Sequence, residues 1–535
     1  METVDALVIG GGHNGLTCAC YLAAAGLRVR VLEARPVLGG AAVTEEFLPG
    51  FRNSALSYTV SLLNPKVIRD LDLAKHGLRV LERPLANFLP LDERRSLSMG
   101  GGLAATQAEV AKFSAADAER LPRYYERLEQ VADVLRDLVL QTPPNVGGGP
   151  GDWLRALATG RRLHRLSMPQ RRDLLAIATR SAGDLLDGWF ESDALKAALG
   201  FDAVVGHYAS PYAPGSGYVL LHHCFGEVNG RRGAWGHAVG GMGSITQAMA
   251  REARARGVQL SVDSPVAEVR VLRGRASGVV LRDSTEIAAA CVVSNVHPKR
   301  LLRDLLPAGT LDAELRERVE GHRNGSGTVR MNLALRALPR FTCLPGEGPH
   351  HRSGIILAPS LGYMERAWMD ARREGLAREP IVEMLIPSTV DDSLAPPGLH
   401  VASLFCQQFA PDLPDHLVPG GWDGARDETV RRIFAVVERA APGFTESVIG
   451  WQLRTPLDLE REFGLIGGDI FHGTLTPDQL YGARPLLGHA DYRMPVRGLY
   501  LCGSGAHPGG GVTGVPGHNA AREILRDWRR GRLRR

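Results

Sequence analysis

The sequence has no apolar run long enough for a transmembrane helix, which needs about 18 or more such residues. It also has little net charge: 63 basic and 58 acidic residues leave a formal charge of +5, too small to favour nucleic acid as a partner. The opening stretch METVDALVIG has no basic segment, so neither a cleavable signal nor a mitochondrial transit peptide is predicted. We therefore expect a cytoplasmic protein.

Cysteine patterns that bind metals are missing as well. The seven cysteines are scattered, none forms C-x-x-C, and their number is odd. This distribution fits a reducing compartment and predicts no metal site. Cys18 and Cys20 stand two apart on a predicted helix, so they point to different sides, and we expect them to pack in the core.

Apolar residues are plentiful enough for a large core. Hydrophobic residues make up 44% of the chain and charged residues 23%, the balance of an ordinary globular protein. A length of 535 residues predicts two or more domains.

A glycine pattern stands close to the N-terminus. The apolar run 4–9 predicts a buried parallel strand. Gly10, Gly12 and Gly15 then form G-x-G-x-x-G, and residues 14–25 are predicted as a helix. The first glycine makes a tight turn, the second lets a pyrophosphate approach the backbone, and the third allows close helix–strand packing. The helix N-terminus offers amides and a partial positive charge to the phosphates.

An acidic residue completes this motif. Residues 27–32 form a second apolar run, and Glu33 ends it, 23 residues after Gly10. A carboxylate at this distance can accept hydrogen bonds from a ribose diol. A glycine-rich surface turn would not explain Glu33, so the pattern predicts a dinucleotide site. The motif alone leaves NAD and FAD open.

Three separated segments are predicted to build one nucleotide-binding domain. The middle segment reads as a glycine loop, a helix over 243–256, a strand and a short β-meander, and the last one as strand, glycine-rich loop and helix. The two insertions should form a substrate domain with a helical region, and the active site should lie at the junction. The three segments are 1–75, 235–300 and 490–535, and the insertions are 76–234 and 301–489.

These segments carry a family resemblance. VIGGGHNGLTCACYLAAAGLRVRVLEARPVLGGAA resembles the N-terminal FAD signature of the phytoene desaturase and amine oxidase superfamily. LYLCGSGAHPGGGVTGVPGHNAAREIL resembles the C-terminal FAD motif of bacterial phytoene desaturases, and WGHAVGGMGSITQAMAREARARGVQL resembles their central segment. The resemblance implies FAD as cofactor and the α/β class: a Rossmann-type, glutathione reductase-like FAD-binding domain with an inserted α+β substrate domain.

A second resemblance is to the group called pyridine nucleotide-disulfide oxidoreductase domain-containing protein 2. It rests on LPGFRNSALSYTVSLLNPKVIRDLDLAKHGL and GGDIFHGTLTPDQLYGARPL. Disulfide reductases need a redox cysteine pair after the FAD motif, and no cysteine lies between Cys20 and Cys224. Thiol–disulfide chemistry is therefore not expected.

The resemblance also implies which residues hold FAD. The glycine turn cradles the pyrophosphate, Glu33 holds the adenosine ribose, and Val266 touches the adenine edge through its backbone. The C-terminal loop lies along the ribityl chain and the flavin, and the helix after it points its N-terminus at the flavin, which stabilises the reduced anion. The implied residues are Gly10, Gly12, His13, Asn14, Gly15, Glu33, Ala34, Arg35, Gly39, Gly40, Ala41, Val266, Gly503, Ser504, Gly511, Val512 and Val515.

One of these residues departs from many relatives. Ser504 stands where they have an aspartate that binds a ribityl hydroxyl or a phosphate. The phytoene desaturase type also lacks that acid, so Ser504 favours this type over the amine oxidases.

No catalytic residue is assigned from the sequence. In the segment 467–486, Asp469 could fix a turn beside a partly exposed His472, and this explanation is as good as a catalytic role. For His507 in the C-terminal loop, a structural role is favoured over a catalytic one. The weak candidates are Asp469, His472, Tyr481 and His507. A further polar cluster, which can also be read as hydrogen-bonded loop residues, consists of Ser54, Ser57 and Tyr58.

Three functions are compatible with FAD. The first is an oxidoreductase, a dehydrogenase, desaturase or saturase, that moves a hydride between flavin N5 and a small hydrophobic substrate. The second is a regulatory or redox-neutral, isomerase-like protein that binds FAD. The third is an amine oxidase, which the C-terminal motif disfavours.

Two basic stretches raise the question of peripheral membrane contact. RALATGRRLHRLSMPQRRDLLAIATR interleaves arginines with leucines, and the tail RDWRRGRLRR is basic. Arginines near an anionic surface contribute about 1 kcal/mol each, and leucines can enter the interface. The favoured alternative is an amphipathic helix that covers the second domain, with a solvated basic tail, because Pro169 interrupts the helix. The oligomeric state is left open.

Overall fold

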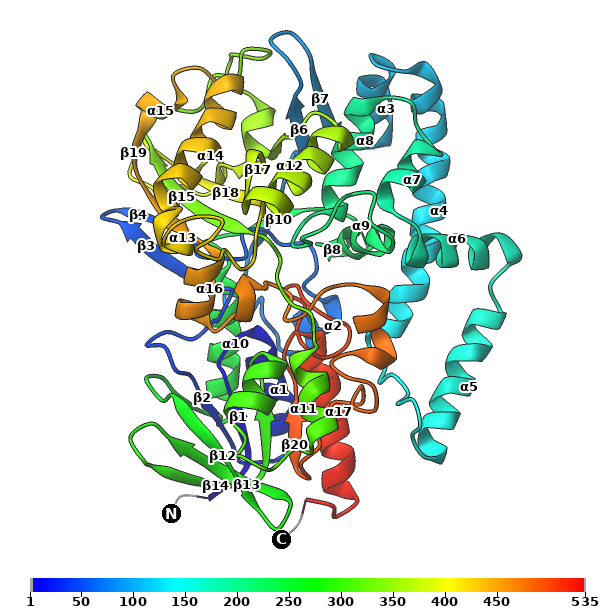
Figure 1. The fold of residues 1–535 in the computed structure, drawn as a ribbon, viewed down its shortest axis with the longest axis vertical. Coiled ribbons are helices and arrows are strands. Elements are labelled where there is room, and N and C mark those ends of the chain that lie inside the picture. The colour runs from blue at the N-terminus through cyan, green and yellow to red at the C-terminus, as the bar shows by residue number, and fades with distance from the viewer. Residues whose placement is uncertain (1–2, 225, 534–535) are drawn as a thin grey trace.

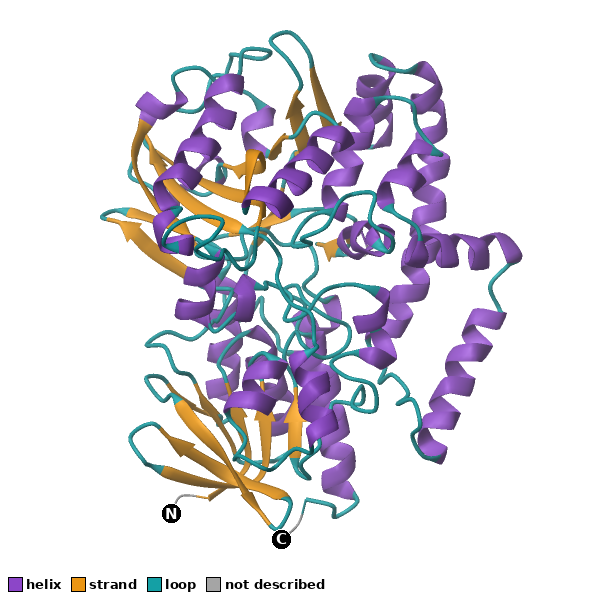
Figure 2. Ribbon diagram, viewed as in Figure 1, coloured by secondary structure: helices purple, strands orange, loops and turns teal. Residues whose placement is uncertain are grey.

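Two seven-stranded sheets organise the computed structural model, which describes residues 3–224 and 226–533. The first sheet lies near both termini, and the second lies at the other end of the molecule, with a helical region beside it (Figure 1; Figure 2). Loops fill the zone between the two sheets.

The first sheet has the strand order β11-β2-β1-β14-β13-β12, and β20 pairs with β14. Ile9 pairs with Leu32 and with Ser294, so parallel strands β1, β2 and β14 end at one edge. Ligands of such sheets bind beyond the carboxyl ends of the strands. The strands are β1 (Thr3–Ile9), β2 (Val29–Leu32), β11 (Gln259–Ser261), β12 (Val266–Leu272), β13 (Arg275–Leu281), β14 (Glu286–Ser294) and β20 (Leu499–Leu501).

Helix α1 packs on this sheet between two other helices that contact it, which makes three helices in all. They are α1 (His13–Ala24), α10 (Gly243–Ala255) and α17 (Val515–Arg529). The sequence predicted the first two within one residue at each end, and α17 begins at Val515 as the resemblance implied. Cys18 and Cys20 are fully buried, as predicted. A Cβ on Gly517 would lie 2.1 Å from the Asn14 carbonyl oxygen, so only glycine allows α17 to approach α1 this closely.

The second sheet has the order β19-β15-β18-β17-β16-β6-β7. Apolar side chains from its strands form a core, and helices α12 and α14 both contact β17. Its strands are β6 (Leu85–Pro90), β7 (Ser96–Gly100), β15 (Val329–Leu335), β16 (Gly354–Leu357), β17 (Leu376–Leu385), β18 (His400–Phe409) and β19 (Val448–Arg454). The helices associated with it are α12 (Leu361–Glu374), α13 (Gly421–Gly424), α14 (Arg426–Ala440), α15 (Phe444–Ser447) and α16 (Pro456–Phe463).

The helical region lies within residues 103–224, where the sequence predicted it. Its helices are α3 (Leu103–Ala111), α4 (Ala115–Val139), α5 (Pro150–His164), α6 (Met168–Thr179), α7 (Ala182–Asp187), α8 (Asp193–Gly200) and α9 (Ser216–Cys224). The shorter elements are β3 (Thr44–Leu48), β4 (Phe51–Ser54), α2 (Pro65–Asp70), β5 (Val80–Glu82), β8 (Glu227–Val228), β9 (Arg231–Arg232), β10 (Gly236–Ala238) and α11 (Ala313–Glu320).

The division into domains stays a prediction. All strands of the first sheet come from the three predicted segments. Two features cross the predicted boundaries: the β3–β4 hairpin contacts β18 and β19 of the second sheet, and leucines after residue 300, including Leu301 and Leu305, join the core of the first sheet. Within residues 3–224 and 226–533, no helix combines the length and apolarity needed to cross a bilayer.

The glycine contact between α1 and α17 can be tested with a matched pair of helical glycines. Gly517→Ala should lower the free energy of unfolding by about 1–3 kcal/mol, because the new methyl group would overlap the Asn14 carbonyl. Gly160→Ala in α5 meets open space and should leave stability equal or higher, by up to about 1 kcal/mol. Urea unfolding of the two variants measures this, and equal midpoints would contradict it.

Candidate active site

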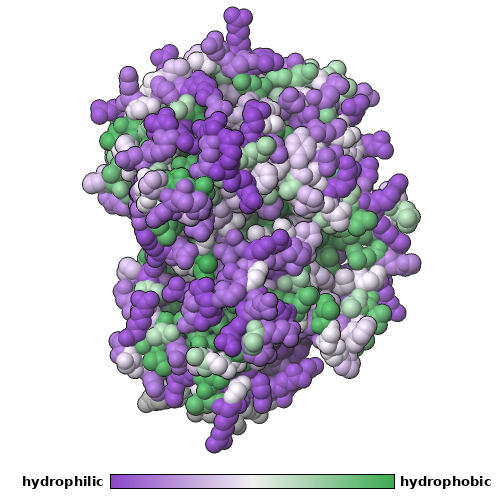
Figure 3. Space-filling model, in the orientation of Figure 1, coloured by the Kyte–Doolittle hydropathy of each residue, from purple (hydrophilic) through white to green (hydrophobic). Residues whose placement is uncertain are grey.

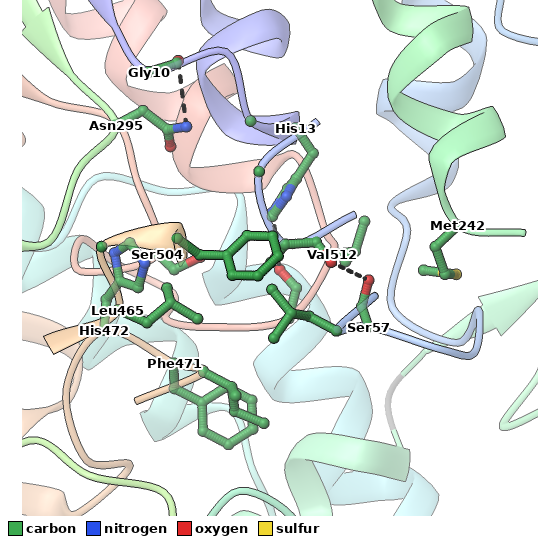
Figure 4. A pocket seen from close by; sticks show the side chains of 18 of the residues that line it. Gly10, His13, Ser57, Met242, Asn295, Leu465, Phe471, His472, Ser504 and Val512 are labelled. Atoms are coloured by element: carbon green, nitrogen blue, oxygen red, sulfur yellow. Dashed lines mark hydrogen bonds between the residues drawn. The ribbon is translucent and has the colours of Figure 1, made fainter. Parts of the chain in front are cut away.

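A cavity of about 510 Å³ lies between the two sheets and is lined from both (Figure 4). One wall comes from the carboxyl edge of the first sheet, with Ile9, Leu32 and Asn295. The opposite wall comes from the second sheet, with Arg330 and Phe405. The cavity therefore stands where the topology of the first sheet places a ligand.

Glycines shape the part of the cavity beside α1. A Cβ on Gly15 would lie 2.2 Å from the Gly10 carbonyl oxygen, and a Cβ on Gly12 would lie 2.8 Å from Asn295 Nδ2. No side chain caps the N-terminus of α1 at Gly12. The first-turn amides are thus left for a ligand, and anions are favoured at such a helix end.

Glu33 stands at the end of β2 and is 8% exposed. Its carboxylate accepts hydrogen bonds from the Gly11 amide at 2.8 Å and from the Arg35 amide at 2.9 Å. These bonds fix the side chain at the cavity wall and leave lone pairs free, because an ionised carboxylate has about four acceptor positions. The geometry fits the bonding of a ribose diol.

The C-terminal loop closes the same space from the far end of the sequence. The ring of His13 is 3.2 Å from the Gly511 carbonyl oxygen, and Asn14 Nδ2 donates to Ser504 Oγ at 3.3 Å. Two buried polar atoms, Asn14 Oδ1 and Arg35 Nη1, have no partner in the protein. Buried polar groups are nearly always satisfied, so these atoms point to a polar ligand that completes the site.

Most of the predicted cofactor residues meet around this cavity, although their roles stay predictions. Those that line it are Gly10, Gly12, His13, Glu33, Ala34, Arg35, Gly40, Ala41, Val266, Ser504, Gly511 and Val512. Those that lie behind the wall are Asn14, Gly15, Gly39, Gly503 and Val515.

The four weak catalytic candidates do not lie together at the cavity. Only His472 lines the cavity. Asp469 is buried and accepts hydrogen bonds from the amides of Gly325, Phe471 and Gly473 at 2.7–3.0 Å, so it holds its own loop. Burial nevertheless raises the pKa of Asp469.

The other two candidates, Tyr481 and His507, contact each other away from the cavity. Their rings are edge to face with centroids 5.3 Å apart. Tyr481 OH is 3.0 Å from Thr159 Oγ1, and the His507 ring is 3.1 Å from the Leu138 carbonyl oxygen. Burial lowers the pKa of His507 to about 4, so its imidazole is neutral at pH 7. These contacts describe a structural role.

His472 belongs to a group of three imidazoles beside a buried arginine. The His297 ring lies 5.4 Å from that of His472 and 5.9 Å from that of His322. Burial, assisted by the positive charge of Arg484, lowers the pKa of His472 to about 3 and that of His322 to about 4. The three rings are neutral at pH 7, so none of them is an imidazolium that could donate its extra proton.

Arg484 is fully buried and organises this side of the site. Its guanidinium donates to the carbonyl oxygens of Phe471 at 2.6 Å and Ser504 at 2.9 Å, with longer bonds to Gly473 and Thr474. Burial lowers the pKa of Arg484 to about 10, which leaves it charged at pH 7. It joins the segment that carries His472 to the C-terminal loop.

Sequence reasoning missed several polar residues of the opposite wall. Arg330 on β15 and Glu383 on β17 project into the cavity, and Asp202 faces it from the turn Phe201–Ala203. A signal was available, because Arg330 and Glu383 are isolated charges within apolar strand-like runs, VRMNLAL and IVEMLI. Charged residues are rarely buried unless they are paired or functional.

Similarity to known proteins agrees with this geometry. The sequence profile of the family described as flavin containing amine oxidoreductase matches residues 15–329, more than half of the chain. The chain belongs to this family. The resemblance found in the sequence is thereby confirmed, together with the α/β FAD-binding fold.

Two relatives and one solved structure match this flavin amine oxidoreductase over at least 95% of its length. Pyridine nucleotide-disulfide oxidoreductase domain-containing protein 2 of Rattus norvegicus is 42% identical, covering 98% of this chain and 93% of the relative. The lycopene-forming phytoene desaturase of Pantoea ananas is 26% identical, covering 95% and 96%. The structure of cyclohexylamine oxidase from Brevibacterium oxydans IH-35A has 15% identity and a TM-score of 0.54, covering 98% and 99%, which shows a shared fold.

The cofactor of this flavin amine oxidoreductase is FAD, and the protein is an oxidoreductase, not a disulfide reductase. Its residues fit the cofactor: the cavity extends from Glu33 and Val266 to Gly511 and Val512, and uncapped amides and orphaned polar atoms lie along it. The seven cysteines are all free.

The role of Glu33 can be measured by FAD affinity. Glu33→Ala should weaken binding by about 1.5–3 kcal/mol, because hydrogen bonds to a charged group are lost. Glu33→Gln should lose less, since one acceptor oxygen remains. Glu268→Ala, an exposed residue of the same sheet, serves as the control and should bind like the wild type. Titration of the apoprotein with FAD measures this, and equal affinity of the Glu33→Ala variant would contradict the role.

Proposed function

We propose that this flavin amine oxidoreductase removes hydrogen from, or adds hydrogen to, a C–C or similar bond of a small hydrophobic substrate. The observation that carries the proposal is the apolar end of the cavity. Phe201, Val205 and Phe405 line it from the substrate side, and Phe471 and Trp235 extend the apolar wall. Such a lining favours a substrate that is mainly hydrocarbon.

The chemistry follows from the cofactor and from the wall that faces it. FAD, when bound, accepts or supplies a hydride. The wall side chains Phe405 and Phe471 are 2% and 5% exposed, so this part of the cavity is shielded from the surface. A similar reaction is named for the Pantoea ananas relative, a phytoene desaturase, which supports a dehydrogenation here.

Two other functions predict different behaviour of the flavin. An amine oxidase would reduce its flavin with amines. A redox-neutral or regulatory protein would bind hydrophobic compounds without net reduction of FAD.

Anaerobic flavin spectra separate these functions. The holoenzyme is mixed with an unsaturated terpenoid hydrocarbon, with a saturated analogue and with dodecylamine. Bleaching by the hydrocarbons, or reoxidation of photoreduced flavin by the unsaturated one, is the expected result. Bleaching by dodecylamine alone would replace the proposal with amine oxidation, and perturbation of the spectrum without reduction would favour the redox-neutral function.

We further propose a peripheral contact with an anionic membrane surface through α5 and α6. Helix α5 has no buried residue, which argues against the alternative for this helix, whereas Leu174 and Ile177 of α6 are partly buried against the helical region. Trp153, Leu154 and Leu157 are 63–69% exposed, and arginines flank them. In Figure 1, α5 stands apart from the body, and Figure 3 shows hydrophobic and hydrophilic side chains mixed at this edge. The combination fits an anionic lipid interface.

Sedimentation with phosphatidylserine-containing vesicles tests this contact. The protein should sediment at low salt and remain in the supernatant at high salt, because screening weakens the arginine contribution. Trp153→Glu combined with Leu157→Glu should abolish sedimentation. Leu272→Glu, which also alters an exposed apolar residue, should have no effect. A wild-type protein that stays in the supernatant at low salt would refute the contact, and its substrate need not then be a lipid.

A further inference from the structure

Three side chains form a row across the second sheet on the cavity wall. Arg330 on β15 pairs with Phe405 on β18, and Phe405 pairs with Glu383 on β17. All three line the flavin cavity. Because residues in register point to the same face of a sheet, the row presents a carboxyl and a guanidinium to the same space, separated by one aromatic ring.

Tyr58 covers this row and fixes Glu383. Its ring stacks on Phe405 with centroids 5.2 Å apart and planes at 29°, and Arg330 Cζ lies 4.4 Å from its centroid. The Tyr58 hydroxyl donates to Glu383 Oε2. These ring contacts and the hydrogen bond together hold the carboxyl in one orientation.

The second oxygen of Glu383 remains available. Within the described part of the chain, Glu383 Oε1 accepts no hydrogen bond and Glu383 forms no ion pair, although the residue is only 6% exposed. The two terminal nitrogens of the Arg330 guanidinium donate to the Leu404 carbonyl oxygen and to Ser403 Oγ, each at 2.7 Å, and its buried Nε has no partner in the protein. A Cβ on Gly354 would lie 2.7 Å from Oε1, so the glycine keeps the space beside this oxygen open.

A second carboxyl faces the same cavity. Asp202 lines it from the helical region, and burial, with the charge of Glu383, raises the pKa of Asp202 to about 8. Burial also raises the pKa of Glu383, while Arg83, Tyr58 and Arg330 favour its ionised form. The groups around Asp202 that can carry charge are neutral at pH 7, since burial raises the pKa of each: Tyr124, Tyr125 and Cys224. The neighbouring His223 is also neutral, because burial lowers its pKa to about 4.

We propose that Glu383 Oε1 is the proton-transfer group of the flavin cavity, with Asp202 as the second carboxyl that exchanges the proton. Forming a C=C bond removes a hydride from one carbon and a proton from its neighbour. FAD, when bound, would take up the hydride with its two electrons. The proton moves to Oε1, and the electron pair of the second C–H bond becomes the π bond. In the reverse direction the carboxylic acid returns the proton to carbon. This inference rests on the proposed function for its catalytic part.

Carbodiimide labelling tests the proton without a substrate. Dicyclohexylcarbodiimide is hydrophobic and adds to protonated carboxyls, and peptide mapping of the holoenzyme locates the adduct. Labelling of Glu383 and Asp202 should fall as pH rises and the carboxyls ionise. Tyr58→Phe removes a hydrogen bond to the ionised form, so the pKa of Glu383 rises and its labelling should persist to a pH higher by about one unit.

If the carbodiimide cannot enter the cavity, infrared spectra still detect whether the two carboxyls are protonated. The holoenzyme should show a carboxylic acid C=O band that shifts in heavy water and is missing in Glu383→Gln or Asp202→Asn. Glu379→Gln, which changes a half-exposed acid on the same strand that pairs with Arg439, serves as the control and should leave the band and the labelling pattern unchanged. Neither label nor band at Glu383 and Asp202 at any pH would overturn the inference.

The catalytic part is tested on flavin reduction. Glu383→Gln should retain FAD and accept electrons from dithionite as the wild type does, yet reduction by an active substrate should slow about 100-fold or more. Unchanged reduction would overturn the role of Glu383 alone. Failure of every compound to reduce the wild type would instead refute the proposed function, while the labelling and infrared results would still report on the carboxyl pair.

Discussion

The approach of α17 to α1 at Gly517 is the contact on which the site depends. Without a side chain at this position, the two helices lie close enough for the C-terminal loop to reach the glycine turn after β1. The bonds from His13 to Gly511 and from Asn14 to Ser504 follow from that approach. A single glycine therefore allows segments almost 500 positions apart to form one cradle. Its surroundings are closely packed, so a larger residue would not fit at this position.

The N-terminal part of the cradle could be predicted from the sequence because its residues are close together in the chain. Gly10, Gly12 and Gly15 make one turn, and Glu33 follows one strand later, so spacing alone determines their proximity. The substrate wall could not be predicted in this way. Arg330 and Glu383 become neighbours only through the pairing of β15, β18 and β17, and that register depends on contacts far apart in sequence. An isolated charge in an apolar run indicates burial, but it does not name the partner across the sheet.

In the segment from Asp469 to Arg484, the sequence pointed to more functional residues than the structure places at the cavity. Its polar residues stood out in the sequence, yet most of them serve the loop itself: Asp469 binds three amides, and Arg484 binds several carbonyl oxygens. Irregular backbone that is buried must satisfy its polar groups with side chains, since no helix or strand does so. Conspicuous polar residues in a glycine-rich loop thus have a structural explanation in which they position His472 rather than react.

The order of the cradle along the chain has a consequence during protein synthesis. The first part of the FAD site is made several hundred residues before the last part, residues 504–512. The first sheet lacks β20, and α1 lacks its contact with α17, until those elements have been made. A nascent chain that has not reached them can therefore hold only part of the cofactor site.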